Sequence, residues 1–569
     1  MNHTRKKLSA LLAAVLMLGT LAACSTQDKN SDAASPESTA GAELNIVNGK
    51  IEPAVTIKTI RAEDPTGSFR EGESWSDNVH TRWARDTLGV NIETLWGSAM
   101  ADGSYNTKLK LMLSANDTLP DVFVVYDKDV ANMFIESGKV LDAGAAFEKY
   151  ASPVWKEAMA ENERAWLPFT RDGQKFGIPI ISNSMGSQSA MWIRQDWLDK
   201  LNLKAPTTVE ELEQVMDAFA NQDPDGNGQK DSVALAFGMK DKVSGYVIGD
   251  GSWIYGLFGA IPERWYPGED GKLQYGSVQP GVKTALSKLK EWKDKGYIAT
   301  DVALHDINKM VELVAGGKVG IIGGQSWFMT YPGALALGSN PNAMFTPFPL
   351  PKGADGTNMR TVNDPYNGVI LISKDISEEA LQALFHYQNK MFSAYESDDP
   401  FIFKGYQEGY DYVIKDGKAT ADTKDIPGGK IGTDKYTLTG VYAMYPSKML
   451  AVDLKLARGE ELTNNDLAVL ANVGIVSGDI TPLDMTTRKG LLVISEQTSA
   501  DVPDYFQGPT TDTMLSRSEL LKKLQMDTYT EILYGKKPVE AFDEFVSKWK
   551  SSGGDEITKE VNEWYDSVK

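Results

Sequence analysis

The chain has 569 residues, with 58 Lys or Arg and 78 Asp or Glu, and a net charge of −20. Its length exceeds what one hydrophobic core usually holds, so we expect two or more lobes. The acidic charge argues against a nucleic-acid-binding protein, because phosphate recognition needs a basic surface.

The N-terminus has the parts of a secretory signal peptide. Basic residues at 5–7 are followed by an apolar stretch at 8–18 and by the sequence Leu-Ala-Ala-Cys, which ends at Cys24. The apolar stretch is too short to span a membrane, so we predict a signal peptide over residues 1–23. Cys24 is the only cysteine in the chain and lies at the cleavage point. This position favours a bacterial lipobox cysteine, which receives a lipid anchor, over a signal that is simply cleaved.

Small and polar residues follow the cysteine. Residues 25–43 read STQDKNSDAASPESTAGAE, and we predict a lipidated cysteine with a flexible tether over 24–45. Because a lipidated Cys24 leaves no thiol, disulfides, zinc–thiolate sites and cysteine nucleophiles are excluded. No later stretch approaches the length of a membrane span. The predicted anchor is therefore the only membrane contact, on the extracellular face of the cytoplasmic membrane.

The first folded unit alternates strand and helix patterns. Strands are predicted at 55–60, 91–96 and 121–126, and helices at 75–88 and 105–113. This β-α-β-α-β order predicts a mainly parallel sheet with helices on both faces.

A second unit begins near residue 186. We predict strands at 190–194, 318–322 and 368–372, and helices at 195–201, 209–220, 280–295, 310–315 and from 376. Residues 339–363 are rich in Pro, Gly and Asn and are predicted to cross between lobes. Beyond residue 510 the chain is predicted to be mostly helical.

The loop after the helix at 209–220 is rich in oxygen-bearing side chains. Its sequence is DPDGNGQKD, and with Asp223 as position 1 the predicted calcium ligands are Asp223, Asp225, Asn227, Gln229 (through its backbone carbonyl) and Asp231. Gly228 occupies position 6, where the sharp turn of a calcium loop requires glycine. Position 12 is Ala234 instead of the usual Glu, so Asp231 or water would complete the shell. An ordinary Asn/Gly turn is the alternative; we favour a permanent structural Ca²⁺ site over a switch.

No local catalytic motif is present. His80, His305 and His386 are isolated, and the chain has neither H-E-x-x-H nor G-x-S-x-G. A pair of carboxylates that hydrolyses a glycoside leaves no local signature, however. A polysaccharide-degrading enzyme therefore stays open as an alternative, although we predict a protein that is not an enzyme.

The thirteen tryptophans indicate a carbohydrate surface, because sugars stack their C–H faces on aromatic rings. Most of them follow helical spacing and are expected in the core. Ligands of open α/β sheets bind beyond the carboxyl ends of strands. Residues in loops at such positions are the predicted ligand contacts: Trp75, Trp96, Asp127, Trp253, Gln325, Trp327, Asn363, Asp364 and Tyr366.

Several stretches together resemble one family. They are the lipobox at Cys24, LSANDTLPDV at 113–122, AMWIRQDWLDKL at 190–201, the loop at 223–231, GGKVGI at 316–321 and FQGPTTDTM at 506–514. With them the chain resembles the large lipoprotein solute-binding proteins of carbohydrate ABC importers in Gram-positive bacteria, within the family 1 extracellular class. The likeness spans most of the mature chain and does not identify a substrate.

The resemblance implies a two-lobed α/β fold of the periplasmic-binding-protein type (type II-like) that closes on an oligosaccharide. With it we expect lobe 1 to comprise 46–185 and about 328–375, and lobe 2 to comprise 186–327 and about 376–500, with 501–569 packing on the lobes. Calcium is implied in the loop of the second lobe, where relatives add an acid and this chain has Ser232. The implied partners are permease subunits and a cytoplasmic ATPase, and the implied state is a monomer. The alternative is a lipid-anchored extracellular enzyme.

Overall fold

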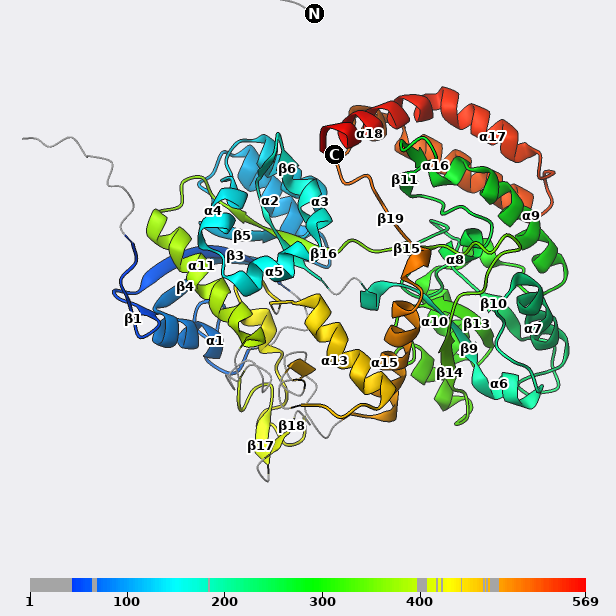
Figure 1. The fold of residues 1–569 in the computed structure, drawn as a ribbon, viewed down its shortest axis with the longest axis horizontal. Helices are drawn as coiled ribbons and strands as arrows, with labels where there is room; N and C mark the ends of the chain where they lie inside the picture. Colours follow the sequence, from blue (N-terminus) through cyan, green and yellow to red (C-terminus); the bar gives the residue numbers. More distant parts are fainter. Residues whose placement is uncertain are drawn as a thin grey trace, which may run out of the picture. The chain divides into compact units, whose positions relative to one another are not determined.

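The computed structural model describes residues 43–63, 69–182, 185–396, 407–415, 418–420, 423–441, 443–463, 466, 469–470 and 480–568. The predicted signal peptide, Cys24 and most of the tether lie outside these residues. The described chain from residue 43 onward forms one compact unit. Its elements group into two lobes, each with its own sheet and cores (Figure 1).

Lobe 1 is built on five longer strands. They are β3 (Val55–Glu63), β4 (Val90–Ala99), β5 (Val122–Val125), β8 (Ile178–Ile181) and β16 (Tyr366–Ile372). Short hairpins accompany them: β1 (Ile46–Val47) with β2 (Lys50–Ile51), β6 (Thr170–Arg171) with β7 (Gln174–Lys175), and β17 (Val413–Lys415) with β18 (Lys418–Thr420). The helices are α1 (Val79–Trp83), α2 (Ser104–Ser114), α3 (Lys128–Glu136), α4 (Ala143–Tyr150), α5 (Pro153–Ala160), α11 (Glu378–Phe392) and α13 (Pro446–Arg458).

Alternation along the central strands explains why both faces of the lobe 1 sheet are covered. In β5, Val122 and Val124 belong to one core and Phe123 and Val125 to another. Successive side chains of a strand point to opposite faces, so an unbroken apolar run buries both. Helices α4, α5 and α11 contribute to the first core, and α2 and α3 to the second.

Lobe 2 has a four-stranded sheet in the order β10-β13-β9-β14. Its strands are β9 (Ala190–Arg194), β10 (Val233–Ala236), β13 (Val319–Gly324) and β14 (Phe345–Phe348), with the hairpin β11 (Trp265–Pro267) and β12 (Leu273–Tyr275). The helices are α6 (Gln195–Lys200), α7 (Val209–Asn221), α8 (Ser252–Gly256), α9 (Pro280–Asp294), α10 (Ile307–Ala315), α15 (Pro482–Ser495), α16 (Asp512–Leu533), α17 (Ala541–Trp549) and α18 (Asp555–Val568). The C-terminal helices pack into the main core of this lobe.

A mainly parallel sheet was predicted for each lobe, but the observed strand directions are mixed. The pairs β3–β4 and β10–β13 are parallel as predicted, but β16 runs antiparallel to both β5 and β8. Likewise β9 runs antiparallel to β13 and β14. Strands β9 and β16 are those by which the chain enters one lobe from the other. They begin at the edge where the neighbouring strands end, and so run in the opposite direction.

The packing leads us to propose lobe boundaries that differ from the predicted ones. Strand β14, expected in lobe 1, pairs with β9 in the lobe 2 sheet. Helix α11, expected in lobe 2, buries Leu381, Leu384 and Phe385 in a lobe 1 core. We propose that lobe 1 comprises about 43–182 and 366–458, and lobe 2 about 190–348 and 480–568.

The connections between the lobes meet at one buried arginine. Strands β15 (Arg360–Val362) and β19 (Asp501–Pro503) form a parallel pair. Arg360 donates Nε to Asp501 Oδ1 at 2.7 Å, Nη1 to the Ser189 carbonyl at 3.1 Å and Nη2 to the Ile494 carbonyl at 2.9 Å. A second contact lies nearby, where Arg488 of α15 pairs with Asp453 of α13 at 3.3 Å. Arg360 thus ties two segments that pass between the lobes, its own and the one that ends at Ser189, to β19 and to the end of α15.

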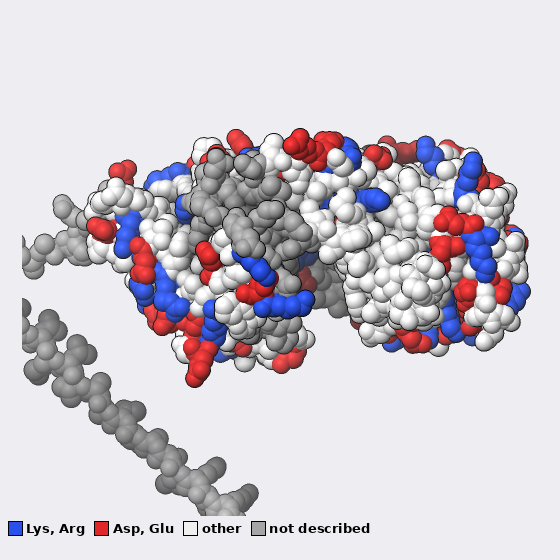
Figure 2. All heavy atoms as spheres, turned by 90° about the horizontal axis from the view of Figure 1, so that it is seen from below, with Lys and Arg blue, Asp and Glu red and all other residues white. Residues whose placement is uncertain are grey.

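The surface carries charges of both signs. Figure 2 shows Lys and Arg interspersed with Asp and Glu on the face it presents, without a continuous basic region. Among the helices of the described residues, none is long and apolar enough to cross a membrane.

Candidate ligand-binding surface and calcium loop

The predicted ligand residues lie beyond strand ends that border the connections between the lobes. In lobe 1, Val125 at the end of β5 pairs with Val369 of β16, and Ile181 at the end of β8 pairs with Tyr366. In lobe 2, Gly324 at the end of β13 pairs with Ala190, where the chain enters the lobe. Because parallel strands end at the same edge, β10 ends at the same edge as β13, and β4 ends beside β3. We call the side chains at these edges the strand-end surface.

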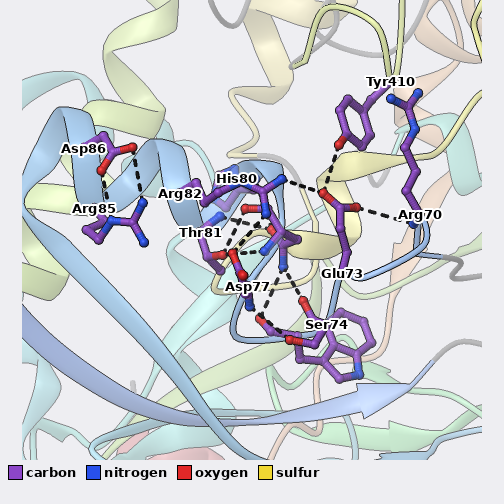
Figure 3. A network of polar contacts seen from close by, with 12 residues as sticks. Arg70, Glu73, Ser74, Asp77, His80, Thr81, Arg82, Arg85, Asp86 and Tyr410 are labelled. Atoms are coloured by element: carbon purple, nitrogen blue, oxygen red, sulfur yellow. Dashed lines mark hydrogen bonds and ion pairs between the residues drawn. The ribbon is translucent and has the colours of Figure 1, made fainter.

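The loop before α1 is fixed by a helix cap. The helix predicted from residue 75 begins at Val79, and Asn78 caps it by accepting hydrogen bonds from the backbone N–H groups of His80 and Thr81. The Asn78 side-chain amide donates back to the carbonyls of Ser74 at 3.0 Å and Trp75 at 3.2 Å. Figure 3 shows this network around the loop. The cap thereby positions Trp75.

A buried carboxylate ties the same loop to a segment more than 330 residues away in sequence. Glu73, whose side chain is 6% exposed, accepts from Arg82 Nη2 at 2.7 Å and from Tyr410 OH at 2.9 Å (Figure 3). The Arg70 guanidinium lies 3.5 Å from the centre of the Tyr410 ring. Charge-assisted bonds of this kind are stronger than neutral ones, so the loop is held as a rigid wall.

Trp75 packs in a small aromatic group on this wall. Its ring meets Phe69 edge-on at 4.8 Å and Tyr436 at 6.3 Å, and Phe69 stacks on Tyr436 at 5.1 Å. The indole N–H donates to Glu63 Oε1 at 3.1 Å, and Trp75 remains half-buried. Arg61 lies 5.7 Å from the Trp75 ring. Aromatic rings beside a carboxylate form the combination of apolar face and hydroxyl acceptor that a sugar requires.

Arg61 is a charged group at the end of a buried strand. It is 4% exposed, and burial lowers the pKa of its guanidinium. It donates to the backbone carbonyls of Thr437 and Tyr436, the latter at 3.3 Å. It therefore holds the segment that carries Tyr436 against β3.

The other predicted residues of lobe 1 occupy the neighbouring strand ends. Trp96 on β4 is half-buried and lies under Lys108, whose Nζ is 4.0 Å from the ring centre. Asp127 caps α3 and accepts from Asn106 Nδ2 at 3.2 Å. These local partners give both residues a structural role as well as a place on the strand-end surface.

In lobe 2, Gln325 and Trp327 follow β13. The Trp192 indole donates to the carbonyl of Gly324 at 3.0 Å and to that of Gln325 at 3.2 Å, which fixes this turn. Gln325 is buried, whereas Trp327 is half-buried. No hydrogen bond or ring contact joins Trp327 to the lobe 1 aromatics within the part of the chain that the structure describes.

Between the lobes, Asn363, Asp364 and Tyr366 lie on the segment from β15 to β16. Asn363 Nδ2 donates to the Ser187 carbonyl at 3.0 Å, and Gln507 Nε2 donates to Asp364 Oδ1 at 2.9 Å. Burial, reinforced by the Asp364 charge, raises the pKa of Tyr366. These residues join two of the connecting segments at the base of the strand-end surface.

Trp253 does not belong with the others. It lies in α8 and is 1% exposed, inside the main core of lobe 2. Its Gly- and Ser-rich flanks led to the prediction of a loop, but the indole packs on β13, where a Cβ at Gly323 would lie 2.7 Å from Trp253 Nε1. The ring has no face toward solvent, so we leave Trp253 out of the strand-end surface.

The predicted calcium loop connects α7 to β10. Asn227 Nδ2 donates to Asp225 Oδ2 at 2.8 Å and to Asp231 Oδ1 at 3.1 Å. The backbone N–H of Gly228 donates to Asp223 Oδ2 at 3.1 Å, and that of Gln229 to Asn227 Oδ1 at 2.6 Å. Gly226 and Gly228 both have φ of 75°, as the tight turn requires. These hydrogen bonds link Asp223, Asp225, Asn227 and Asp231 within one tight turn.

The charges of this loop are partly balanced by protein groups. Lys318 Nζ lies 3.0 Å from Asp231 Oδ2. Partial burial raises the pKa of Asp225, whereas the hydrogen bond from Asn227 and the Lys318 ammonium lower the pKa of Asp231. Among the described residues there is no group of three or more His, Cys, Asp or Glu placed to hold a metal ion.

Sequence reasoning missed part of the surface. Arg61 and Glu63 follow the predicted strand end at residue 60, and β3 in fact continues to Glu63. Extending the strand by its alternation would have placed both at its carboxyl end. Tyr436, Tyr410 and Gln507 carry no local signal, because only folding brings them beside the strand ends.

The chain has relatives among known proteins. Residues 66–388 match the family model described as bacterial extracellular solute-binding protein. Lipoprotein LipO of Bacillus subtilis (strain 168) is 26% identical over 491 residues, which cover 84% of this chain and 87% of LipO. The fructooligosaccharide ABC transporter substrate-binding protein FusA of Streptococcus pneumoniae serotype 4 (strain ATCC BAA-334 / TIGR4) is 27% identical over 320 residues, 54% of this chain and 56% of FusA.

Solved structures share the fold. FusA in complex with kestose superposes with a TM-score of 0.57 at 17% identity, covering 90% of this chain and 99% of that one. The alginate-binding protein AlgQ2, in a structure without calcium ion, gives a TM-score of 0.58 at 17% identity and covers 92% of this chain and 100% of that one. The expected two-lobed binding-protein fold is thereby confirmed.

Proposed function

This chain belongs to the bacterial extracellular solute-binding proteins, and from that membership we propose that it captures an oligosaccharide outside the cell and delivers it unaltered to an ABC importer. The observation that carries the proposal is the strand-end surface, where the half-buried Trp75 of lobe 1 stands beside the Glu63 carboxylate and Trp327 of lobe 2 is also half-buried. FusA, a relative of this chain, is named for fructooligosaccharide transport.

The two-lobed arrangement supports a closing mechanism. A ligand that contacts Trp75 on lobe 1 and Trp327 on lobe 2 makes its full set of contacts only when the lobes approach. Its binding therefore stabilises the closed state by the difference between the ligand's contact free energies in the closed and open states. The connecting segments joined at Arg360 supply the axis about which such a movement occurs.

We propose that Cys24 is lipidated and anchors the protein at the extracellular face of the cytoplasmic membrane. The lipobox pattern supports this, as does the likeness to Lipoprotein LipO. The proposed partners are the permease subunits and the cytoplasmic ATPase of the importer, approached by the protein as a monomer. The tether of small polar residues would give the folded part the reach to dock on them.

We further propose a structural Ca²⁺ ion in the loop at 223–231, held by Asp223, Asp225, Asn227, Asp231 and the Gln229 carbonyl. The proposal is supported by the Asp225 and Asp231 carboxylates, which lie close enough together to accept hydrogen bonds from the same Asn227 amide. Hard cations prefer such oxygen ligands. Two solved structures with the same fold add support by analogy, since FusA has been solved as an EF-hand mutant and AlgQ2 without calcium ion.

Chelation tests the calcium proposal. Treatment with EDTA is expected to lower the melting temperature, because bound ligand contributes about 2.7 kcal/mol at a hundredfold excess over Kd. The double variant Asp225→Ala/Asp231→Ala should start from the lower temperature and ignore EDTA. A matched control, Asp270→Ala/Asp355→Ala, removes two exposed turn carboxylates and should respond as the wild type does. A wild-type protein indifferent to EDTA would refute calcium here.

A calorimetric titration with a panel of oligosaccharides tests the function itself. We expect saturable binding of at least one sugar, which chromatography then recovers intact. The competing hypothesis, a polysaccharide-degrading enzyme, predicts shortened products during the same incubation. Products that accumulate with time would overturn the transport proposal in favour of that enzyme.

A further inference from the structure

The turn at 324–327, which carries Trp327, is fixed to the sheet of lobe 2. The Trp192 indole of β9 donates to the first two carbonyls of the turn, at 3.0 and 3.2 Å. Trp192 is fully buried in a core of this lobe, so the turn rests on a rigid floor. The backbone N–H of Phe328 closes the turn by donating to the Gln325 carbonyl at 2.9 Å.

Ser326 joins the same turn to the chain that enters lobe 2. The Ser326 hydroxyl donates to the Gly186 carbonyl at 3.1 Å, and its backbone N–H donates to the same oxygen at 3.4 Å. Gly186 precedes β9, on the segment by which the chain passes from lobe 1 into lobe 2. Asn363, on another connecting segment, donates to the Ser187 carbonyl at 3.0 Å. The turn is therefore tied to the connections between the lobes.

Helix α15 packs against the turn through a glycine. A Cβ added at Gly490 would lie 2.8 Å from the Ser326 carbonyl oxygen, 3.0 Å from Ser326 Cα and 3.1 Å from Trp192 Cζ2. Two of these three atoms belong to the main chain, which cannot rotate away as the tip of a side chain can. The third belongs to the buried ring that forms the floor of the turn. Position 490 therefore holds glycine only because the turn lies so close.

Glycine is otherwise a poor residue for this place in the helix. Helix α15 runs from Pro482 to Ser495, so Gly490 lies in its interior. An interior glycine destabilises a helix relative to alanine, because it has more conformational freedom to lose on folding. What Gly490 provides is the close approach of the helix to Ser326.

Helix α15 is itself held where the lobes are joined. Its Ile494 carbonyl accepts from Arg360 Nη2 at 2.9 Å, and Arg360 is the residue at which the connecting segments meet. Arg488 of α15 pairs at 3.3 Å with Asp453 of α13, a helix that packs in a lobe 1 core. Both arginines are buried. Gly490 thus lies between two contacts that fix α15 relative to lobe 1 and to the connecting segments.

We propose that Gly490 is a positioning residue for sugar binding: through its contact with Ser326, α15 sets the place of Trp327 relative to the connections between the lobes. The role rests on the proposed function, since Trp327 is a proposed sugar contact. A side chain at position 490 displaces the turn, because neither the Ser326 main chain nor the Trp192 ring has room to yield. The Trp327 ring then meets the sugar in a less favourable place.

Calorimetry on Gly490→Ala tests the proposal. The probe is the trisaccharide among kestose, maltotriose, cellotriose and xylotriose that binds the wild type most tightly. It should bind Gly490→Ala about threefold to tenfold more weakly. Gly338→Ala is the matched control, because it makes the same substitution in lobe 2 where a Cβ meets nothing within 4 Å. Lys489→Ala changes the exposed neighbour on α15, and both controls should bind as the wild type does.

A measurement without sugar separates this proposal from the proposed function. In protein labelled with fluorotryptophan, Trp327→Phe identifies the Trp327 fluorine resonance by its loss. Gly490→Ala should shift this resonance, whereas Gly338→Ala should leave it in place. If the resonance shifts but the wild type binds no sugar, the placement of Trp327 by α15 stands and the proposed function fails.

A second variant covers the case in which Gly490→Ala does not fold. Ser326→Ala removes only the hydroxyl bond to Gly186 and adds no atom, so it loosens the same turn without a clash. It should shift the Trp327 resonance and weaken binding of the same trisaccharide. Unchanged sugar affinity in a folded Gly490→Ala, with or without a shifted resonance, would overturn the proposal. So would an unchanged Trp327 resonance and affinity in Ser326→Ala if Gly490→Ala cannot be obtained.

Discussion

Acidification from pH 7 to pH 4 is expected to lower the free energy of unfolding by about 3 kcal/mol through a single histidine. The loss is roughly 1.4 kcal/mol for each pH unit below the pKa that this histidine has in the unfolded chain. His80 of α1 is fully buried, and burial, assisted by the Arg61 charge, lowers its pKa from 6.5 to about 3. Its Nε2 lies 2.7 Å from Tyr387 OH, and the Trp83 ring packs at 5.3 Å.

The sign follows from proton uptake. Below pH 6.5 the unfolded chain protonates this imidazole, while the folded chain keeps it neutral until about pH 3. The unfolded state thus binds the extra proton, and stability falls as the pH drops through this window. Tyr387 OH also accepts from the Leu438 N–H at 3.1 Å, which holds it beside the His80 ring.

Urea unfolding at several pH values measures this effect. His80→Gln should flatten the pH dependence of the unfolding free energy between pH 6.5 and 4, whatever its absolute stability. His386→Gln changes a half-buried histidine that contacts the Gly49 carbonyl, and should leave the steep dependence in place. Equal slopes for the wild type and His80→Gln, or an NMR titration of the His80 ring near its usual pKa, would contradict the argument.

Removing the tryptophans of the strand-end surface is expected to give the largest loss of sugar affinity. Trp75→Ala and Trp327→Ala should each weaken oligosaccharide binding by on the order of tenfold or more, as aromatic anchors at binding sites do. Trp75 is half-buried and pairs with Glu63, so its loss removes an apolar face and frees the carboxylate. Both variants should fold, because neither ring is fully buried.

Two controls sharpen this experiment. Trp75→Phe retains a ring and should keep more affinity than Trp75→Ala. Leu111→Ala removes a side chain that is 63% exposed on α2 and should bind as the wild type does.

Trp253→Ala should instead lower stability by about 3 to 5 kcal/mol, the usual result for a large core residue. Unchanged sugar affinity in both Trp75→Ala and Trp327→Ala would show that the sugar does not bind at the strand-end surface.

Local patterns predicted the elements of this fold better than their assembly. The strand at 190–194 and the helices at 209–220 and 280–295 were predicted to within a residue. Their apolar spacing reports directly on the face that each buries. Strand direction was harder, since the antiparallel course of β16 depends on where the chain returns from the other lobe.

In the candidate site too, local patterns were easier to predict than contacts between residues far apart in sequence. The oxygen-rich loop at 223–231 was visible because its groups lie within nine residues. Trp253 was misjudged, because glycine and serine neighbours indicate a turn and say nothing of burial. Partners such as Tyr410 and Gln507 reach the surface only through contacts across more than 140 residues of sequence.

Small-angle X-ray scattering of the protein with an oligosaccharide that binds it tests the central claim most directly. We predict that the radius of gyration falls at saturation, as two lobes close on the sugar, and that the sugar is recovered unchanged afterwards. Scattering curves that stay identical at full occupancy, or a sugar that is cleaved during the measurement, would contradict it.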